Sequence, residues 1–101
     1  MGAGKYILEG RTPKEEYDLL AWARWFEPAN RTVARTQLPG GVEDSTVFLG
    51  LDHNFADSGP PILFETMVFG GKMDQESSRY STWEEAEAGH RAMVMKVEAT
   101  Q

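Results

Sequence analysis

Two runs of strongly apolar residues dominate the pattern of hydrophobic and polar positions along this sequence. Thr46–Asp52 (TVFLGLD) and Ile62–Phe69 (ILFETMVF) are rich in β-branched and aromatic residues, so both predict strands. The alternation of the first run continues to about Phe55, and residues 56–61 then hold a glycine and two prolines, which indicate a reversal of the chain. Because the second run has large apolar side chains on both faces, we expect helices over one face and partial cover on the other.

Two weaker strand patterns occur nearer the N-terminus, one before and one after a segment with helical spacing. Tyr6–Glu9 predicts a short first strand, and Arg31–Leu38 predicts another that ends in the turn Pro39–Gly41. The segment Gly70–Arg79 is polar and glycine-led, which is typical of a mobile connection.

The first helix is predicted from Thr12 to about Glu27. Thr12 suits an N-cap, Pro13 suits the first helical position, and Glu15 would complete a capping box with Thr12. Apolar residues at helical spacing form one stripe, comprising Leu19, Ala23 and Phe26, which Trp22 and Trp25 widen. These aromatic residues are typical of a core, and the alternative is that one tryptophan is an interface anchor.

The second helix is predicted to begin at Ser81, with Glu84 as its capping-box partner. Its apolar stripe consists of Trp83, Ala86, His90, Met93, Val94 and Val97. Gly89 disfavours a helix interior, so it predicts a close approach of the helix to the sheet or to a partner.

The order strand, helix, strand, strand, strand, helix predicts an α+β fold. Short turns favour a mostly antiparallel sheet of about four strands, with both helices covering one side as a second layer. A chain of 101 residues fits a single domain spanning residues 1–101, in which residues 1–5 are expected to be a flexible N-terminal tail.

The charge balance restricts the classes of partner. Ten basic and sixteen acidic side chains give a net charge of −6, so direct binding to nucleic acid or to an anionic membrane is not expected. The chain has no cysteine and no apolar run of membrane-spanning length, which together favour a cytoplasmic protein.

Acidic side chains are the most frequent candidates for a binding surface. Acidic groups occur at Glu43–Asp44 and, near the start of the second helix, at Glu84, Glu85 and Glu87, and the plain interpretation is a solvated surface. The alternative is an acidic face that docks on a basic protein, with Trp22 and Trp25 as candidate anchors.

Catalytic signals are weaker. His53 and His90, joined by Asp52 or Glu65, would supply two imidazoles and a carboxylate for a metal-assisted hydrolase, although 37 positions separate the histidines. No serine has the glycines of a nucleophile elbow, no motif calls for a cofactor, and we expect none. The sequence therefore favours a protein without enzymatic activity.

A third hypothesis is a structural or assembly factor, in which Trp22, Trp25 and Phe26 mediate self-association and the chain forms a homodimer. It differs from the other two in needing no second protein and no metal.

Three phrases carry a resemblance: Thr46–His53, Phe64–Gly71 and Arg79–His90. In this order they resemble small uncharacterised proteins encoded by bacteriophages and prophages, from Tyr6 onward. The resemblance implies an accessory protein in the cytoplasm of an infected bacterium, whose partner would be a host or phage protein. Inhibition of a host defence nuclease complex is one such role, and the resemblance brings no catalytic residue or cofactor.

Overall fold

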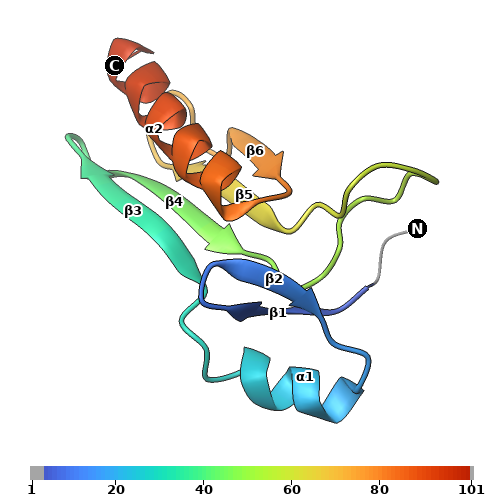
Figure 1. The fold of residues 1–101 in the computed structure, drawn as a ribbon. Helices are drawn as coiled ribbons and strands as arrows, with labels where there is room; N and C mark the ends of the chain where they lie inside the picture. The colour runs from blue at the N-terminus through green and yellow to red at the C-terminus, as the bar shows by residue number, and fades with distance from the viewer. Residues whose placement is uncertain (1–3, 101) are drawn as a thin grey trace.

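A computed structural model of the chain describes residues 4–100. The strands are β1 (Tyr6–Glu9), β2 (Thr12–Glu15), β3 (Thr32–Leu38), β4 (Val42–Phe48), β5 (Phe64–Phe69) and β6 (Ser77–Tyr80); the helices are α1 (Leu19–Phe26) and α2 (Trp83–Thr100). A four-stranded antiparallel sheet of order β3-β4-β5-β6 lies beneath α2, and the β1–β2 hairpin and α1 lie at one end of it (Figure 1). The α+β class, the antiparallel meander and the two helices are confirmed.

The four-stranded sheet with α2 and the β1–β2 hairpin with α1 are two parts that lie end to end, which gives an elongated molecule of 44 × 31 × 19 Å. The expectation that both helices cover the same sheet is wrong, because α2 contacts all four of its strands whereas α1 packs on β1. Trp25 is one of the links between the two parts, since its ring and that of Phe48 meet edge to face at a centroid distance of 5.8 Å. The sheet therefore has one face under α2, and no helix within residues 4–100 covers its opposite face.

The first helix begins later than its capping signal indicates. Thr12–Glu15 forms β2, in which Thr12 pairs with Glu9 and Pro13 with Leu8, across a turn where Gly10 has a φ of 63°. The cap is instead Asp18, whose carboxylate accepts hydrogen bonds from the backbone of Leu20 and Ala21. The local sequence Thr12–Glu15 matches a capping box, but pairing with β1 holds this segment as an extended strand instead.

The strand predicted from Thr46 begins at Val42 and ends at Phe48. Gly50, with a φ of 77°, then redirects the chain, and a Cβ at this position would lie 2.6 Å from the Phe26 ring. The redirected segment pairs with the N-terminus, since Leu51 forms an antiparallel bridge with Lys5. Lys5 is therefore not part of a tail, and residues 1–3 lie outside the described residues.

The polar connection predicted over Gly70–Arg79 contains an unpredicted strand. From the end of this stretch, Ser77–Tyr80 forms β6, which pairs with β5 from Phe64 opposite Tyr80 to Met67 opposite Ser77. Serine and arginine are not among the β-branched and aromatic residues that favour strands, so the local pattern did not indicate this element.

Two apolar clusters fill the layer between α2 and the sheet. The cluster at the β3–β4 turn contains Leu38, Val42, Val68, Met93 and Val97, and the cluster toward the hairpin contains Phe48, Leu63, Phe64 and Ala86. The predicted inner stripe of the last helix is confirmed at four positions, Ala86, His90, Met93 and Val97, which are all buried. Polar residues of β4 and α2 lie between the two clusters.

Candidate functional site

An open groove lies along one side of α2, beside β6 and the loop that leads into β5. It has a volume of about 630 Å³ and continues into a hollow of about 260 Å³ farther along the helix. The helical wall consists of Glu85, Ala88, Gly89, Ala92, Met93 and Lys96. Short side chains in the middle of this wall leave the groove open, and charged side chains stand at its two ends.

Gly89 and Tyr80 form the floor of the groove. A Cβ at Gly89 would collide with the Tyr80 ring, so only glycine lets β6 lie this close to α2. The close approach predicted for Gly89 is thereby confirmed, and its partner is β6. Tyr80 also packs against the cluster that holds Phe64, which fixes the end of the strand under the helix.

The strand β6 is an edge of the four-stranded sheet (Figure 1). The inner side of β6 is paired with β5 and the residue before it. The Glu76 carbonyl accepts a hydrogen bond from Val68 N at 3.0 Å, and the Tyr80 carbonyl accepts one from Leu63 N at 2.9 Å. Because main-chain groups alternate in direction along a strand, those of Ser77 and Arg79 point away from β5, along the outer edge.

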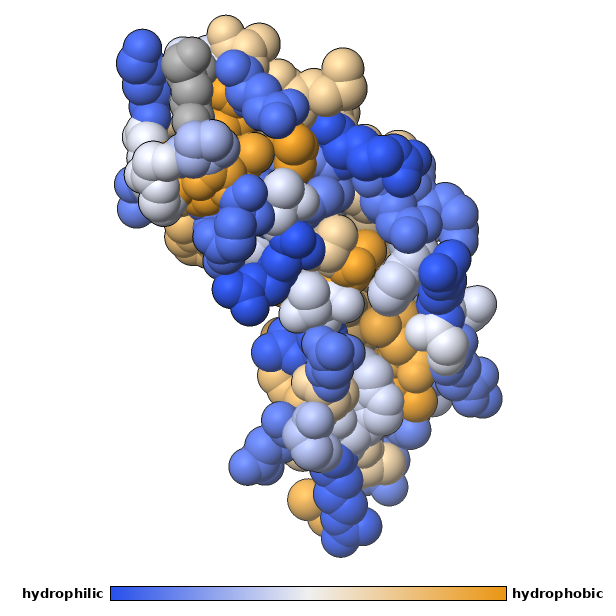
Figure 2. All heavy atoms as spheres, turned by 90° about the vertical axis from the view of Figure 1, so that its left-hand side faces the viewer, coloured by the Kyte–Doolittle hydropathy of each residue, from blue (hydrophilic) through white to orange (hydrophobic). Residues whose placement is uncertain are grey.

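The other edge of the sheet, at β3, differs from β6. A register shift between Thr32 and Ala34 interrupts its pairing with β4, and such a bulge makes an edge a poor template for another strand. The side of the molecule that carries this edge is mostly hydrophilic, with apolar atoms visible only as separate areas (Figure 2). Of the two edges, only β6 adjoins the groove.

The acidic residues at the start of α2 divide into two kinds. Glu85 forms the capping box, because its Oε1 accepts hydrogen bonds from the backbone of Ser81 and Thr82 while the Thr82 hydroxyl accepts one from Glu85 N, all at 3.1 Å. The predicted box of Ser81 and Glu84 is wrong by one residue. Glu84 and Glu87 form no ion pair within residues 4–100, so their charges remain available to a partner.

The two candidate tryptophan anchors are held inside the fold. The Trp22 indole donates to the carbonyls of Tyr6 and Gly50, at 3.1 Å each, and its ring stacks on Phe26 at 4.6 Å. Trp25 packs on the core at Phe48. Both are half-buried, which agrees with the core interpretation of this aromatic cluster. The exposed apolar residues nearby are Tyr17, Leu19 and Leu20, which are 84%, 57% and 64% exposed.

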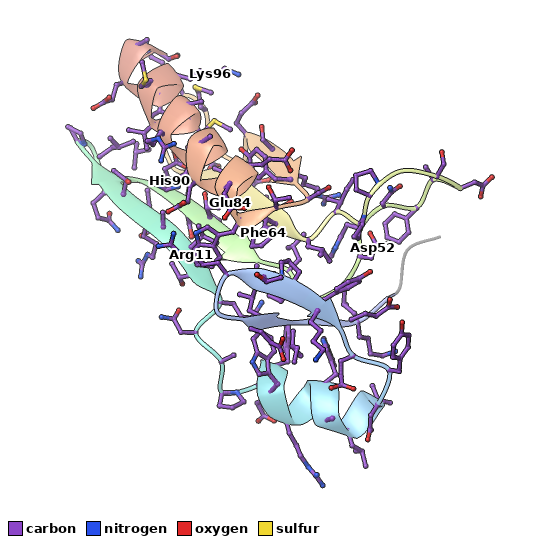
Figure 3. The ribbon with its side chains drawn as sticks, in the orientation of Figure 1. Arg11, Asp52, Phe64, Glu84, His90 and Lys96 are labelled. Carbon is purple, nitrogen blue, oxygen red and sulfur yellow. The ribbon has the colours of Figure 1, made fainter. Side chains whose placement is uncertain are left out.

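The four residues of the metal hypothesis do not meet. His90 is on the buried face of α2, whereas Asp52 lies well away from it in the loop beyond β4 (Figure 3). Asp52 accepts hydrogen bonds from the backbone of Asn54 and Ile62, and His53 lies 2.8 Å from the Leu51 carbonyl.

Glu65 is on the opposite face of the sheet from His90. It pairs with Arg79 at 2.9 Å, and its neighbour Thr66 faces the helix. Across the described part of the chain, no group of three histidine or carboxylate side chains could hold a metal ion. The metal site predicted for His53, His90 and a carboxylate is therefore wrong, because these residues do not come together.

His90 instead belongs to a buried polar cluster. Its Nε2 lies 2.8 Å from the Thr36 hydroxyl and its Nδ1 lies 2.7 Å from the Thr46 hydroxyl, which itself lies 2.5 Å from the Thr66 hydroxyl. Burial, followed by the charge of Arg91, lowers the pKa of His90, so the ring is neutral at neutral pH. Thr46 and Thr66 are 0% exposed and His90 is 5% exposed, so most of this cluster is closed to solvent.

Asp44 lies in the same layer and is also 0% exposed. It directly faces Thr36 across the β3–β4 pair, and neither of its carboxylate oxygens has a hydrogen-bond partner among the described residues. Burial alone raises its pKa to about 6. The sequence pattern placed Asp44 in a surface acidic group, and this interpretation is wrong.

Among the described residues, the groove lining holds one carboxylate, that of Glu85, which caps α2. The helical wall of the groove could have been located from the sequence by the small residues that flank Gly89, but its other wall, β6, was not predicted. No helix within residues 4–100 combines the length and the apolar composition needed to cross a membrane. No family model, curated protein or solved structure matches this chain.

Proposed function

We propose that this chain is a non-enzymatic binding protein that docks on another protein through α2, using the groove beside this helix and the free carboxylates of Glu84 and Glu87, which lie outside the groove lining. The observation that carries the proposal is the groove of about 630 Å³ beside an edge strand. Its lining holds one carboxylate, that of Glu85, and this group already caps α2. A surface of this kind offers shape and hydrogen-bonding groups for recognition, without a reacting centre.

Electrostatics indicate the kind of partner. With a net charge of −6 and unpaired carboxylates at Glu84 and Glu87, the protein attracts a basic surface and repels an acidic one. Surfaces that bind nucleic acid are basic, so a nuclease complex is one such target. The resemblance to phage and prophage proteins supplies the setting of this proposal, an accessory protein acting on a host or phage protein in the bacterial cytoplasm.

The experiment that tests the acidic face uses charge reversal without loss of the helix cap. Glu84→Lys with Glu87→Lys changes the face and keeps Glu85, which the capping box requires. The matched control, Glu27→Lys with Glu98→Lys, makes the same change of charge; Glu98 lies about 20 Å from Glu84 along the helix axis. Each tagged variant is used to capture proteins from bacterial extract, which are identified by mass spectrometry.

We expect the first variant to lose a specific protein that the wild type and the control both retain. If both variants capture the same proteins as the wild type, Glu84 and Glu87 are not the docking surface. Thermal unfolding of each variant verifies that the fold is unchanged.

Self-association is a second candidate, favoured by the exposed residues Tyr17, Leu19 and Leu20 at the start of α1. Exposed apolar groups at one place are typical of an interface. Light scattering at increasing protein concentration tests it: a dimer that Leu20→Glu dissociates supports this role, and a monomer at every concentration rejects it.

A further inference from the structure

The outer edge of β6 has main-chain groups available for pairing. Those of Ser77 and Arg79 point away from β5, and the sheet order places no described strand beyond β6. An exposed edge of this kind is a template for one more strand, whose backbone supplies the missing donors and acceptors. The chemistry of the edge therefore specifies an extended peptide rather than a compact small molecule.

The groove lies where the side chains of such a strand would project. Alternate residues of an added strand point toward α2, and there they meet Ala88, Gly89 and Ala92, whose side chains take up little room. The volume of about 630 Å³ is within the range of pockets that enclose a sizeable ligand. Edge and groove are thus two halves of one site, the edge for the peptide backbone and the groove for its side chains.

Charge at the ends of the groove favours a basic peptide. Both cations of the lining are compensated, because the Lys96 ammonium at one end lies 3.5 Å from Glu76 and the Arg79 guanidinium lies 2.9 Å from Glu65. At the other end, Glu85 lines the groove and is balanced by no cation within the described residues. The net field along the site is therefore negative, as it is for the whole chain.

We propose that the groove binds an extended, basic segment of a partner protein, which pairs with β6 as a fifth strand and inserts alternate apolar side chains against α2. This inference rests on the proposed binding role and adds the chemical class of the partner. A second copy of the chain is a poorer occupant, because its β6 would offer Ser78 and a Tyr80 that already lies against its own helix. Two chains of net charge −6 also repel each other.

The test starts from a displayed library of random linear peptides of about ten residues, a length that exceeds a typical strand. Enriched peptides are synthesised and their affinities measured by calorimetry at low and high salt. Amide hydrogen exchange then locates each peptide on the protein. We expect basic peptides with alternating apolar residues, weaker binding at high salt, and slowed exchange at the amides of Ser77 and Arg79.

Paired variants separate strand addition from other kinds of contact. Ser77→Pro removes an outward N–H and is tolerated at an edge, whereas Ser77→Ala keeps it. Ala92→Phe fills the groove, and Ala99→Phe makes the same change on the exposed end of α2 outside it. The first member of each pair should weaken peptide binding about tenfold or more, and the second should leave it within about twofold.

The outcomes also separate this inference from the proposed binding role. No enriched peptide, exchange protection away from β6, or equal binding by Ser77→Pro and Ser77→Ala each overturns strand addition. The binding role survives these results if the Glu84 and Glu87 reversal still removes a captured protein. A concentration-dependent dimer that Ser77→Pro abolishes would instead identify the occupant of the edge as a second copy and reject the peptide.

Discussion

Asp44 should make the protein less stable at neutral pH than at mildly acidic pH. Its carboxyl group is fully buried in the layer between the two apolar clusters, with neither oxygen hydrogen-bonded among residues 4–100. A charge in such a place is costly unless it is paired. Asp44→Asn keeps the shape of the side chain and removes the charge, so it isolates the cost of ionisation.

The magnitude follows from the raised pKa. Burial takes the pKa of Asp44 from 3.8 in the unfolded chain to about 6 in the folded protein. As pH rises between these values, the unfolded chain releases the proton while the folded protein retains it, so stability falls through this window and levels off above it. A shift of this size corresponds to about 3 kcal/mol.

Urea unfolding of the wild type and of Asp44→Asn, followed by tryptophan fluorescence, measures this difference at several pH values. The free energy of unfolding of the variant should exceed that of the wild type by about 2 kcal/mol more at about pH 8 than at about pH 4, where part of the effect is already present. His90 has a lowered pKa, which reduces stability as pH falls below 6.5, but it is present in both proteins and cancels in the difference. A difference that does not change with pH would refute a buried, titrating Asp44.

Three further predictions concern the contacts that position α2 and α1. Gly89→Ala should destabilise the wild type, because its Cβ meets Tyr80, but should stabilise a Tyr80→Ala background by about 1 kcal/mol through helix propensity; thermal unfolding of the four proteins of this cycle measures both effects. Thr82→Ala should lower the free energy of unfolding by about 1 kcal/mol and Thr82→Ser should restore most of it, since only the hydroxyl accepts from Glu85 N. Trp22→Phe removes an indole N–H that donates to two carbonyls and should cost about 2 kcal/mol in urea unfolding; an unchanged value would show that these hydrogen bonds are replaced by water.

The parts of the fold that the sequence predicted are those where one local signal agrees with the tertiary environment. The strand at Ile62–Phe69 was recognised because its β-branched and aromatic residues also fill the core, as Phe64 and Val68 do. The inner stripe of α2 was recognised for the same reason, and Gly89 correctly indicated a close approach. These positions are buried, and burial is what the apolar pattern reports.

The errors occur where tertiary pairing opposes the local signal. Thr12 and Glu15 match a capping box, yet the backbone of this segment pairs with β1. Asp44 is buried, yet the sequence predicts it on the surface, because unpaired buried carboxylates are rare and no sequence pattern identifies them. The strand β6 has an unremarkable sequence, and its existence depends on β5 offering an edge. The groove could not be predicted because one of its walls is this strand.

The polar layer under α2 and the groove beside it are connected through two adjacent residues. His90 contacts Thr36 of β3 and Thr46 of β4, which anchors the helix over that half of the sheet. Gly89, the preceding residue, lies against Tyr80 of β6 on the other side. The position of α2 on the sheet is thus fixed from both sides, by the directional hydrogen bonds of His90 and by the close contact of Gly89 with Tyr80. Apolar packing alone would fix this position less strictly. Because the width of the groove is set by where α2 lies relative to β6, the buried hydrogen bonds of His90 help to keep the proposed peptide site open.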